Sequence, residues 1–482
     1  MKKFNILIII IVIFLCYMLT PIVFQNDTFY TIKIGELIVH NGIDMLDHFS
    51  IHNIAYTYPH WLYDVFIYII YHFFSFTGIY ISTIILFIGL MLSIYYTNTK
   101  LNKHKIIIAF ITIISILPLT KYATARAQLV SYILFVWEYY FIERFLQTKN
   151  KKYALYLVVI SLILCNIHVA VWPFYFILFL PFIAEYLIAK VFKLKTLFKE
   201  RIIIEKNNNV KYLLIIILIS LLTGLLTPIK DTPYTYLIYT MMGDSQNYIQ
   251  EHLTLDKVGI IYVITFLIEY LVLIIMSKTK LRYLFLTIGL AIMCYTSNRH
   301  VALFVILFSF VFINVLDNFF IKYKLKVDNL IKLITNKYIT VIIILLLCGS
   351  SIFVFIKNQD KEYFTNDNYP IKASDYIINH LDYKNIRMFN EYNYGSYLIY
   401  RGIPVFIDSR ADLYTKEFSG LDYDIFDDYI EYGINYNDII DFYNLNYVLL
   451  CKERGLYTVF LYNSNYKVLY EDDSFILFEK IK

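Results

Sequence analysis

Charged residues are scarce in this chain, at 17% of its 482 positions. Soluble globular domains carry about 25% charged residues, so this shortage excludes an ordinary soluble protein. Hydrophobic residues reach 59% and aromatic residues 19%. The net charge of +5 is small and spread over many loops, which argues against a nucleic-acid partner. The composition therefore predicts an integral membrane protein.

Glycine and proline are scarce too, with 14 and 9 residues, and cysteine occurs five times. Four of the cysteines lie inside hydrophobic runs and one lies near the C-terminus, so their spacing predicts neither a disulfide framework nor a zinc motif. The hydrophobic segments contain no paired interruptions by glycine or proline at matching positions, which disfavours a transporter.

Long hydrophobic runs recur along residues 1–357. The first, Phe4 to Phe24, follows Lys2 and Lys3 and has no small-residue cleavage site after it, which is typical of a retained anchor helix. A membrane span needs roughly 20 apolar residues. Ten further candidates lie at about residues 79–97, 106–120, 129–146, 153–169, 173–190, 212–228, 258–277, 283–297, 301–319 and 339–357. These runs predict a mainly α, polytopic transmembrane bundle of about eleven spans.

Residues 61–78 are ambiguous, because this hydrophobic stretch carries Asp64 and His72. If the stretch lies along the membrane interface and does not cross, every later basic cluster falls on the side of Lys2 and Lys3. Those clusters lie at residues 100–105, 144–152, 190–211, 278–282 and 322–337. Because cytoplasmic loops hold the positive excess, we favour the interfacial interpretation. The N-terminus is then cytoplasmic and residues 358–482 are extracytoplasmic.

The segments left on the outer side hold most residues with catalytic or binding chemistry. These are Asp27 and Asp47 in the first outer loop (residues 25–78), and Arg126, His168, Glu251, Arg299 and His300 in later ones. A carboxylate beside the bilayer can act as a general base, and an arginine can clamp a phosphate through two parallel hydrogen bonds. Taken singly, Asp27 is equally well a helix cap and each arginine an interfacial anchor. Their convergence on one face favours a site for an anionic, lipid-linked ligand.

Several short motifs follow one another in a recognisable order. The first outer loop contains Asp27, Gly35, Ile38, Gly42, the run Asp47-His48-Phe49-Ser50 and Trp61-Leu62, and later segments read RAQLVSY (126–132), NIH (166–168), TP (227–228) and NRHVALF (298–304). With FNEYNYGSYLIY and VFIDSRADLY near the C-terminus, this pattern resembles the GT-C superfamily of multispanning membrane glycosyltransferases, in particular its RgtA/B/C/D-like bacterial members. Two positions depart from that pattern, since Ala127 stands in place of proline and His252 in place of tryptophan.

The resemblance implies a polyprenyl-phosphate-linked sugar as donor and transfer at the outer membrane face. It implies that Asp27 is the catalytic carboxylate and that Asp47 supports it. Arg126 and Arg299 would bind the leaving phosphate, and the two histidines His168 and His300 would help to hold the donor. The later outer loops carry no Asp-x-Asp or Glu-x-Asp motif, so no cofactor is assigned and a divalent metal stays open.

Residues 358–482 have the pattern of a small α/β domain. Strands are predicted at 385–392, 404–410, 446–453 and 465–480, helices at 371–382 and 436–445, and turns at Gly395, Gly402 and Gly455. NEYNYGSYLI distantly resembles the WWDYG element with which oligosaccharyltransferases hold their acceptor. That resemblance implies an acceptor or lid role for Tyr394, Asp408 and Arg410, and we group Glu251 with them. The alternative, slightly favoured, is a structural ion pair between Asp408 and Arg410.

Two hypotheses of different classes follow. The first is a glycosyltransferase that moves a sugar from a polyprenyl-phosphate carrier to an extracytoplasmic acceptor, with residues 1–357 as the GT-C-like transmembrane domain and membrane lipid as a further partner. The second is a non-catalytic membrane subunit that assembles or handles lipid-linked glycans. A shared fold does not decide between them.

Overall fold

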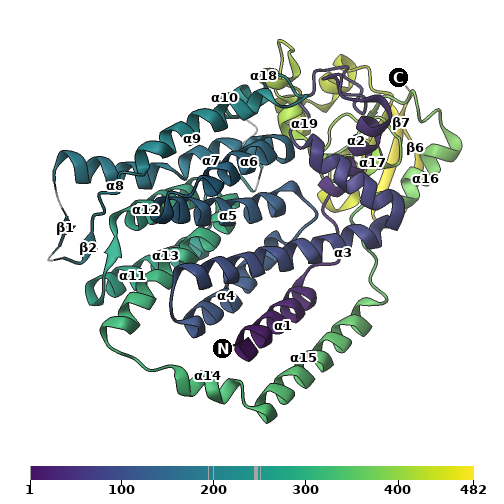
Figure 1. The fold of residues 1–482 in the computed structure, drawn as a ribbon. Coiled ribbons are helices and arrows are strands. Elements are labelled where there is room, and N and C mark those ends of the chain that lie inside the picture. Colours follow the sequence, from purple (N-terminus) through teal and green to yellow (C-terminus); the bar gives the residue numbers. More distant parts are fainter. Residues whose placement is uncertain (1, 194, 199, 244–247, 250, 482) are drawn as a thin grey trace. The chain divides into compact units, whose positions relative to one another are not determined.

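The computed structural model describes residues 2–193, 195–198, 200–243, 248–249 and 251–481 (Figure 1). The fold is mainly helical, at 68%. The chain divides into two compact units, each assembled from separate stretches of sequence. Unit 1 comprises Met1–Pro21, Tyr80–Thr227 and Ile249–Lys361, and unit 2 comprises Ile22–Ile79, Pro228–Tyr248 and Glu362–Lys482. Unit 2 thus combines most of the predicted first outer loop with the C-terminal residues.

Unit 1 is built almost entirely from helices. They are α1 (Lys2–Leu19), the later part of α3 (Trp61–Leu101), α4 (Lys105–Leu119), α5 (Ala127–Thr148), α6 (Lys151–Ile167), α7 (Trp172–Ile177), α8 (Leu180–Val191), α9 (Val210–Leu222), α11 (Lys257–Met276), α12 (Leu281–Thr296), α13 (Val301–Lys322), α14 (Asp328–Ile334) and α15 (Lys337–Asn358), with 3-10 turns η1 (Thr120–Tyr122), η2 (Val169–Val171), η3 (Thr223–Leu225) and η5 (Asn298–His300). Helix α13 packs against α4, α5, α11 and α12. Among the membrane-length helices of the described residues, its segment Asn298–Lys322 is the most buried, and its apolar side chains form much of the core.

Among the described residues, seven helices are long and apolar enough to cross a membrane. They cover Lys2–Leu19, Trp61–Leu101, Lys105–Tyr122, Val169–Val191, Lys257–Met276, Asn298–Lys322 and Lys337–Asn358. The most apolar window of α15 buries none of its residues inside the protein, and apolar exposure on this scale suits contact with lipid. The predicted helical fold with apolar, membrane-length helices is confirmed, while the predicted number of spans stays a prediction.

Helix α3 is kinked at Ser75, where the backbone leaves the helical region with φ 55° and ψ −159°. A positive φ at a non-glycine residue is uncommon and marks a real change in the chain path. The kink separates residues 61–74 from residues 76–101. The first part carries Asp64 and His72, the two polar residues that make the stretch ambiguous in the sequence.

A buried ion network fixes the end of unit 1 where α5, α8 and α12 meet. Arg282 Nε donates to Glu143 Oε1 at 3.0 Å, and its Nη1 donates to Glu185 and Glu205, each at 2.7 Å. Nearby, β1 (Thr196–Leu197), β2 (Ile202–Ile203) and β3 (Thr279–Lys280) form a small sheet in that order. One guanidinium thus ties together segments from four parts of the sequence.

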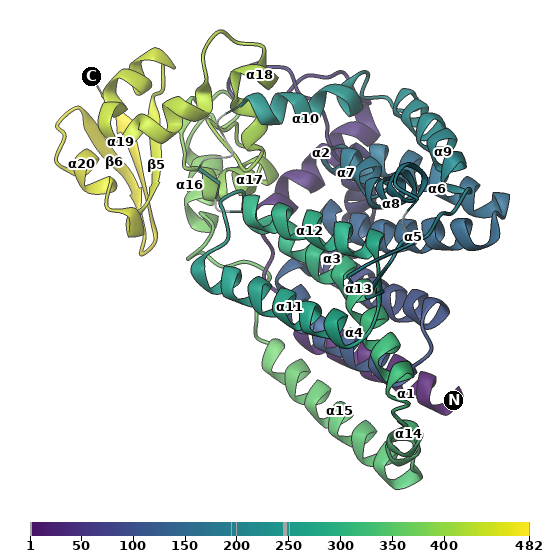
Figure 2. The ribbon, with the colours of Figure 1, turned by 90° about the vertical axis from the view of Figure 1, so that its left-hand side faces the viewer.

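Unit 2 packs short helices around a four-stranded sheet. Its elements are α2 (Asp27–Asn41), the first part of α3, α10 (Thr232–Met242), α16 (Ile371–His380), β4 (Met388–Phe389), α17 (Tyr392–Tyr400), η6 (Ala411–Tyr414), α18 (Lys416–Ser419), α19 (Ile425–Phe442), β5 (Tyr447–Cys451), η7 (Lys452–Arg454), α20 (Tyr457–Leu461), β6 (Tyr466–Glu471) and β7 (Phe475–Lys480). The sheet order is β4-β5-β7-β6, with β4 and β5 parallel and the other pairs antiparallel. Figure 2 shows β5 and β6 beside α19 and α20. Helix α2 packs against α17, so the segment that follows α1 is an integral part of this unit.

The strand predicted at residues 404–410 is wrong, because this fully described segment makes only an isolated parallel bridge between Val405 and Ser50. The Asn390 side chain takes the place of a neighbouring strand. Its Oδ1 accepts from the N–H of Phe406 at 2.8 Å, and its Nδ2 donates to the carbonyl oxygen of Ile407 at 2.7 Å. The backbone groups are satisfied without a ladder.

The turn predicted at Gly395 is also wrong, since this residue lies inside α17. Glycine is needed there for space, because an added Cβ would lie 2.1 Å from the carbonyl oxygen of Ile407. The turns at Gly402 and Gly455 are confirmed. Both residues have positive φ values, 77° and 72°, which glycine adopts at little cost.

Candidate functional site

Two arginines predicted to bind phosphate contact the same short segment of unit 1. Arg126 Nη1 donates to both carboxylate oxygens of Glu251, at 2.8 and 2.9 Å. Arg299 Nη1 lies 3.0 Å from Nε2 of His252. Because Glu251 and His252 are adjacent in sequence, the two guanidinium groups belong to one cluster. The structure thus brings together Arg126, Arg299 and Glu251, three of the residues singled out from the sequence.

Backbone contacts fix this segment against the turn that precedes α13. The N–H of Arg299 donates to the carbonyl oxygen of Glu251 at 3.0 Å, and the N–H of Asn298 donates to that of Leu253 at 2.9 Å. Arg126 is the N-cap residue of α5, and Arg299 lies in η5 immediately before α13. Both arginines therefore stand at N-terminal helix ends, where unpaired N–H groups add partial positive charge.

The cluster carries more positive than negative charge at neutral pH. Burial alone would raise the pKa of Glu251, but the neighbouring Arg126 guanidinium brings it below its usual value. Burial, together with the charge of Arg299, lowers the pKa of His252 to about 4, so this imidazole is neutral at pH 7. Two guanidinium groups thus face one carboxylate. The side chains of Arg126 and Glu251 are 24% and 47% exposed, so an anion outside the protein can reach them.

The two predicted histidines use their Nδ1 atoms within unit 1. Nδ1 of the buried His168 lies 3.0 Å from Ser131 Oγ. Nδ1 of His300 lies 2.9 Å from the carbonyl oxygen of Met293. His300 is close enough to His252 to influence its pKa, whereas the contact to Ser131 ties His168 to α5. Their direct role in donor binding stays a prediction.

Asp27, the predicted catalytic carboxylate, is the first residue of α2 and is half-buried. The capping interpretation was one position off, because the helix begins at Asp27 itself and Asn26 is its N-cap. A carboxylate in the first turn is favoured by the helix dipole. The charge of Asp27, after the larger effect of burial, raises the pKa of Tyr369, so the two side chains are neighbours in unit 2.

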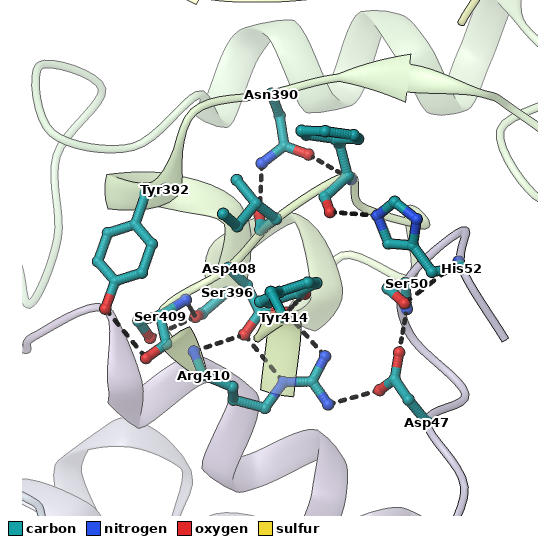
Figure 3. Close-up of polar contacts among 12 residues, drawn as sticks. Asp47, Ser50, His52, Asn390, Tyr392, Ser396, Asp408, Ser409, Arg410 and Tyr414 are labelled. Carbon is teal, nitrogen blue, oxygen red and sulfur yellow. Dashed lines mark hydrogen bonds and ion pairs between the residues drawn. The ribbon is translucent and has the colours of Figure 1, made fainter. Parts of the chain in front are cut away.

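Asp47 lies in a buried ion network with the C-terminal residues of unit 2 (Figure 3). Arg410 Nη1 donates to Asp47 Oδ1 at 2.5 Å, and Arg410 Nε and Nη2 donate to the two oxygens of Asp408 at 2.9 and 2.7 Å. The Tyr414 hydroxyl also donates to Asp408. Ser50 N–H donates to Asp47 Oδ2 at 2.7 Å, which closes the network around one guanidinium.

The side chains of Asp47 and Asp408 are 0% exposed and that of Arg410 is 3% exposed. Burial would raise the pKa of Asp47, but Arg410 and Ser50 together lower it below its usual value. The Asp47 carboxylate and the Arg410 guanidinium therefore both stay charged inside the protein. The structural ion pair offered as the alternative for Asp408 and Arg410 is present. The acceptor role of these residues, and the supporting role of Asp47 in catalysis, stay predictions.

Tyr394 is buried, and its hydroxyl donates to the carbonyl oxygen of Leu449 at 2.6 Å. Sequence reasoning overlooked three residues that complete these sites, His252, Asn390 and Tyr414. His252 had a signal, since it follows Glu251 directly and stands where the glycosyltransferases that the sequence resembles have tryptophan. Asn390 and Tyr414 had none, because their roles depend on partners brought close only by folding.

Within the described part of the chain, no group of three or more His, Cys, Asp or Glu side chains could hold a metal ion. No family model matches the chain, and no curated protein matches its sequence.

Proposed function

We propose that the chain is a membrane glycosyltransferase that moves a sugar from a polyprenyl-phosphate carrier to an acceptor outside the cytoplasm. The observation that supports this most is the arginine pair on one segment, Arg126 on Glu251 and Arg299 on His252. The pair stands at two helix N-termini in a unit of membrane-length apolar helices. Such a place suits a phosphate whose lipid tail lies among helices.

In this proposal the phosphate of the donor lies against Arg299, and Arg126 exchanges Glu251 for a phosphate oxygen. The acceptor hydroxyl oxygen attacks the anomeric carbon while the bond from that carbon to the phosphate oxygen breaks. Asp27 takes the hydroxyl proton as general base. The polyprenyl phosphate leaves with the bonding electron pair, and the arginines stabilise its charge. The buried network of Asp47 then acts indirectly, by holding the first outer loop in shape.

The proposed topology has eleven spans, a cytoplasmic N-terminus and extracytoplasmic residues 358–482. Residues 61–74 lie along the interface, and the kink at Ser75 supports this reading. The basic clusters between spans then all face the cytoplasm. The number of spans and the orientation are tested together by labelling single cysteines placed in the loops, from outside intact cells.

The activity is tested by transfer of label from radiolabelled polyprenyl-phosphate sugars in membranes that contain the protein. We expect wild type to transfer label and Asp27→Asn, which keeps the shape but removes the base, to lose transfer. Asp441→Asn removes an exposed carboxylate of the same unit and serves as the matched control. Equal transfer by wild type and Asp27→Asn would exclude Asp27 as the base.

The phosphate site is tested by the donor dependence of the rate. Charged hydrogen bonds contribute about 1.5–3 kcal/mol, so we expect Arg299→Ala to raise the KM for donor by about tenfold to a hundredfold. Arg144→Ala, at the far end of α5 from Arg126, is the control. An unchanged KM in Arg299→Ala would remove the arginine pair from the donor site.

The non-catalytic alternative is favoured by one observation, the two-oxygen contact between Arg126 and Glu251, which satisfies the guanidinium without a ligand. Glu251→Gln separates the two proposals. In a transferase this change releases Arg126 toward phosphate, so we expect a lower KM for donor. In a non-catalytic subunit the same variant, like wild type, transfers no label from any donor.

A further inference from the structure

Unit 2 contains a cavity of about 380 Å³ beside the start of α2. Its volume is within the range of small-molecule sites. Buried aromatic side chains line its inner part, among them Phe24, Tyr369, Tyr394 and Phe475. The cavity draws on both the first outer loop and the C-terminal residues of this unit, and its lining belongs to neither the Arg126 cluster nor the Arg410 network.

The inner lining is held in place by hydrogen bonds. Glu391 Oε2 accepts from the N–H of Cys451 at 2.9 Å. The Tyr369 hydroxyl donates to the carbonyl oxygen of Phe24 at 3.1 Å. The Tyr394 hydroxyl is bonded to the backbone of β5. Because these groups are anchored, the cavity keeps its shape without a ligand, which lowers the entropic cost of binding.

The lining has a marked chemical bias. Three carboxylates face the cavity, Glu391 in the buried part and Asp367 and Glu453 among exposed residues. The amides of Asn368 and Asn393 complete its polar groups. None of the lining side chains that the structure describes is basic. Carboxylates and amides accept from hydroxyl and ammonium groups, and aromatic faces attract cations.

The cavity also adjoins the proposed general base. Phe24 precedes Asp27 by three residues and is bonded through its carbonyl oxygen to Tyr369. The charge of Asp27 acts on that same tyrosine. A ligand in the cavity therefore lies next to the turn that carries Asp27. A catalytic carboxylate needs its acceptor hydroxyl close by, within hydrogen-bond reach.

We propose that this cavity binds the acceptor, and that the acceptor is a hydroxyl-rich group that carries a protonated amine, such as an amino sugar. The cavity binds the amine through Glu391, Asp367 and Glu453 and packs the sugar ring against the aromatic side chains. The role of this ligand as acceptor rests on the proposed glycosyltransferase function, whereas the binding of an amine-bearing saccharide rests on the cavity alone.

Cys451 lines the cavity and is half-buried, so it reports on occupancy without an added label. The test measures alkylation of Cys451 by N-ethylmaleimide in the full-length protein, with the modified peptide quantified by mass spectrometry. Glucosamine is the cationic probe, and glucose, in which a hydroxyl replaces the amine, is the neutral control of nearly the same shape. We expect glucosamine, at about ten times its dissociation constant, to slow alkylation about tenfold, and glucose to protect far less.

Two exposed carboxylates allow the charge to be changed without disturbing the core. We expect Glu453→Gln and Asp367→Asn each to weaken protection by glucosamine, and Asp441→Asn, outside the cavity, to leave it unchanged. Calorimetric titration of the same proteins with both sugars gives the comparison independently of the thiol. Equal binding of both sugars, binding of neither, or no effect of Glu453→Gln and Asp367→Asn would overturn the proposal.

The outcome is distinguishable from that of the transfer assay. Selective protection by glucosamine with no transfer from any donor would keep the cavity as a binding site and reject the glycosyltransferase. Transfer by wild type with no glucosamine binding would keep the enzyme and reject this cavity as its acceptor site.

Discussion

Arg410 Nη1 lies 2.5 Å from Oδ1 of Asp47, a residue 363 positions earlier in the chain. The opposite edge of the guanidinium binds Asp408, and its flat face lies over the ring of Tyr56 at 5.0 Å. All the charges involved are buried. A side chain of residues 358–482 thus binds the segment that contains Asp47 inside unit 2.

Removing Arg410 should unfold or loosen unit 2. Arg410→Ala leaves two buried carboxylates without their cation, and loss of one partner of a buried pair costs about 3–5 kcal/mol. Arg401→Ala is the control, because its partner Asp375 is 55% exposed and exposed pairs contribute about 0–1 kcal/mol. Thermal unfolding of both variants in detergent checks this. Equal melting temperatures for Arg410→Ala and wild type would contradict it.

His52 should make stability depend on pH between about 6.5 and 4. Burial is the main cause that lowers the pKa of His52 to about 4, although the Phe406 carbonyl and Asp47 act in the opposite direction. The unfolded chain therefore binds a proton near pH 6.5 while the folded chain does not. This contribution to stability is intact above pH 6.5 and is lost as the pH falls toward 4.

The expected loss from His52 is at most about 3 kcal/mol. His52→Gln can still donate to the Phe406 carbonyl but does not titrate, so its unfolding midpoint should fall less steeply over that pH range. His380→Gln removes an exposed imidazole of the same unit and is the control. Identical pH profiles for wild type and His52→Gln would rule out this residue as the source.

Glu138 and Glu143 should respond in opposite ways to substitution by leucine. Both lie buried on α5, but neither carboxylate oxygen of Glu138 has a hydrogen-bond partner among the described residues, whereas Glu143 is paired with Arg282. Glu138→Leu removes an unsatisfied buried group, so we expect stabilisation by about 1–3 kcal/mol. Glu143→Leu removes the acceptor of Arg282 Nε and Nη2 but leaves Glu185 and Glu205 on its Nη1, so we expect destabilisation by about 1–3 kcal/mol. Thermal unfolding of the two variants measures both changes. Destabilisation by Glu138→Leu would contradict the prediction and would show that the Glu138 carboxyl group stabilises the fold.

Gly395→Ala should be strongly destabilising although alanine favours helices. The new Cβ would lie 2.1 Å from the backbone oxygen of Ile407 and 2.8 Å from Cα of Asp408, and backbone atoms cannot move aside as a side chain can. Gly289→Ala in α12 is the control, because nothing lies within 4 Å of its Cβ position. There we expect a neutral change or stabilisation by up to about 1 kcal/mol. A folded, fully stable Gly395→Ala protein would refute the argument.

The features that depend on neighbouring residues could be predicted from the sequence. The apolar runs of α1 and α15 identify helices by length alone. The apolar pattern of residues 465–480 predicts strand, and the structure divides this stretch into β6 and β7, which pair with each other. The pair Asp408 and Arg410 could be predicted because the residues are two positions apart. In each case the physical cause lies within a few residues.

The features that depend on distant residues could not be predicted. Residues 404–410 read as a strand, but Asn390 replaces the ladder with side-chain hydrogen bonds. The predicted topology and the motifs around Arg126 and Arg299 singled out both residues, yet no local pattern shows that both contact residues 251–252. Asp47 likewise gives no local sign of Arg410. The sequence identifies these residues as candidates, but only the folded structure shows which partners they contact.

The discontinuity of unit 2 has a consequence for biosynthesis. A ribosome releases Asp47 early, but Arg410 leaves it only after every candidate membrane helix of unit 1 has been made. During that interval Asp47 lacks its buried cation, and residues 22–79 lack the C-terminal residues with which they form unit 2. Nascent chains that stop before residue 410 should therefore be bound by chaperones or degraded by proteases. A truncation that removes Arg410 should leave the segment around Asp47 without its stabilising ion pair.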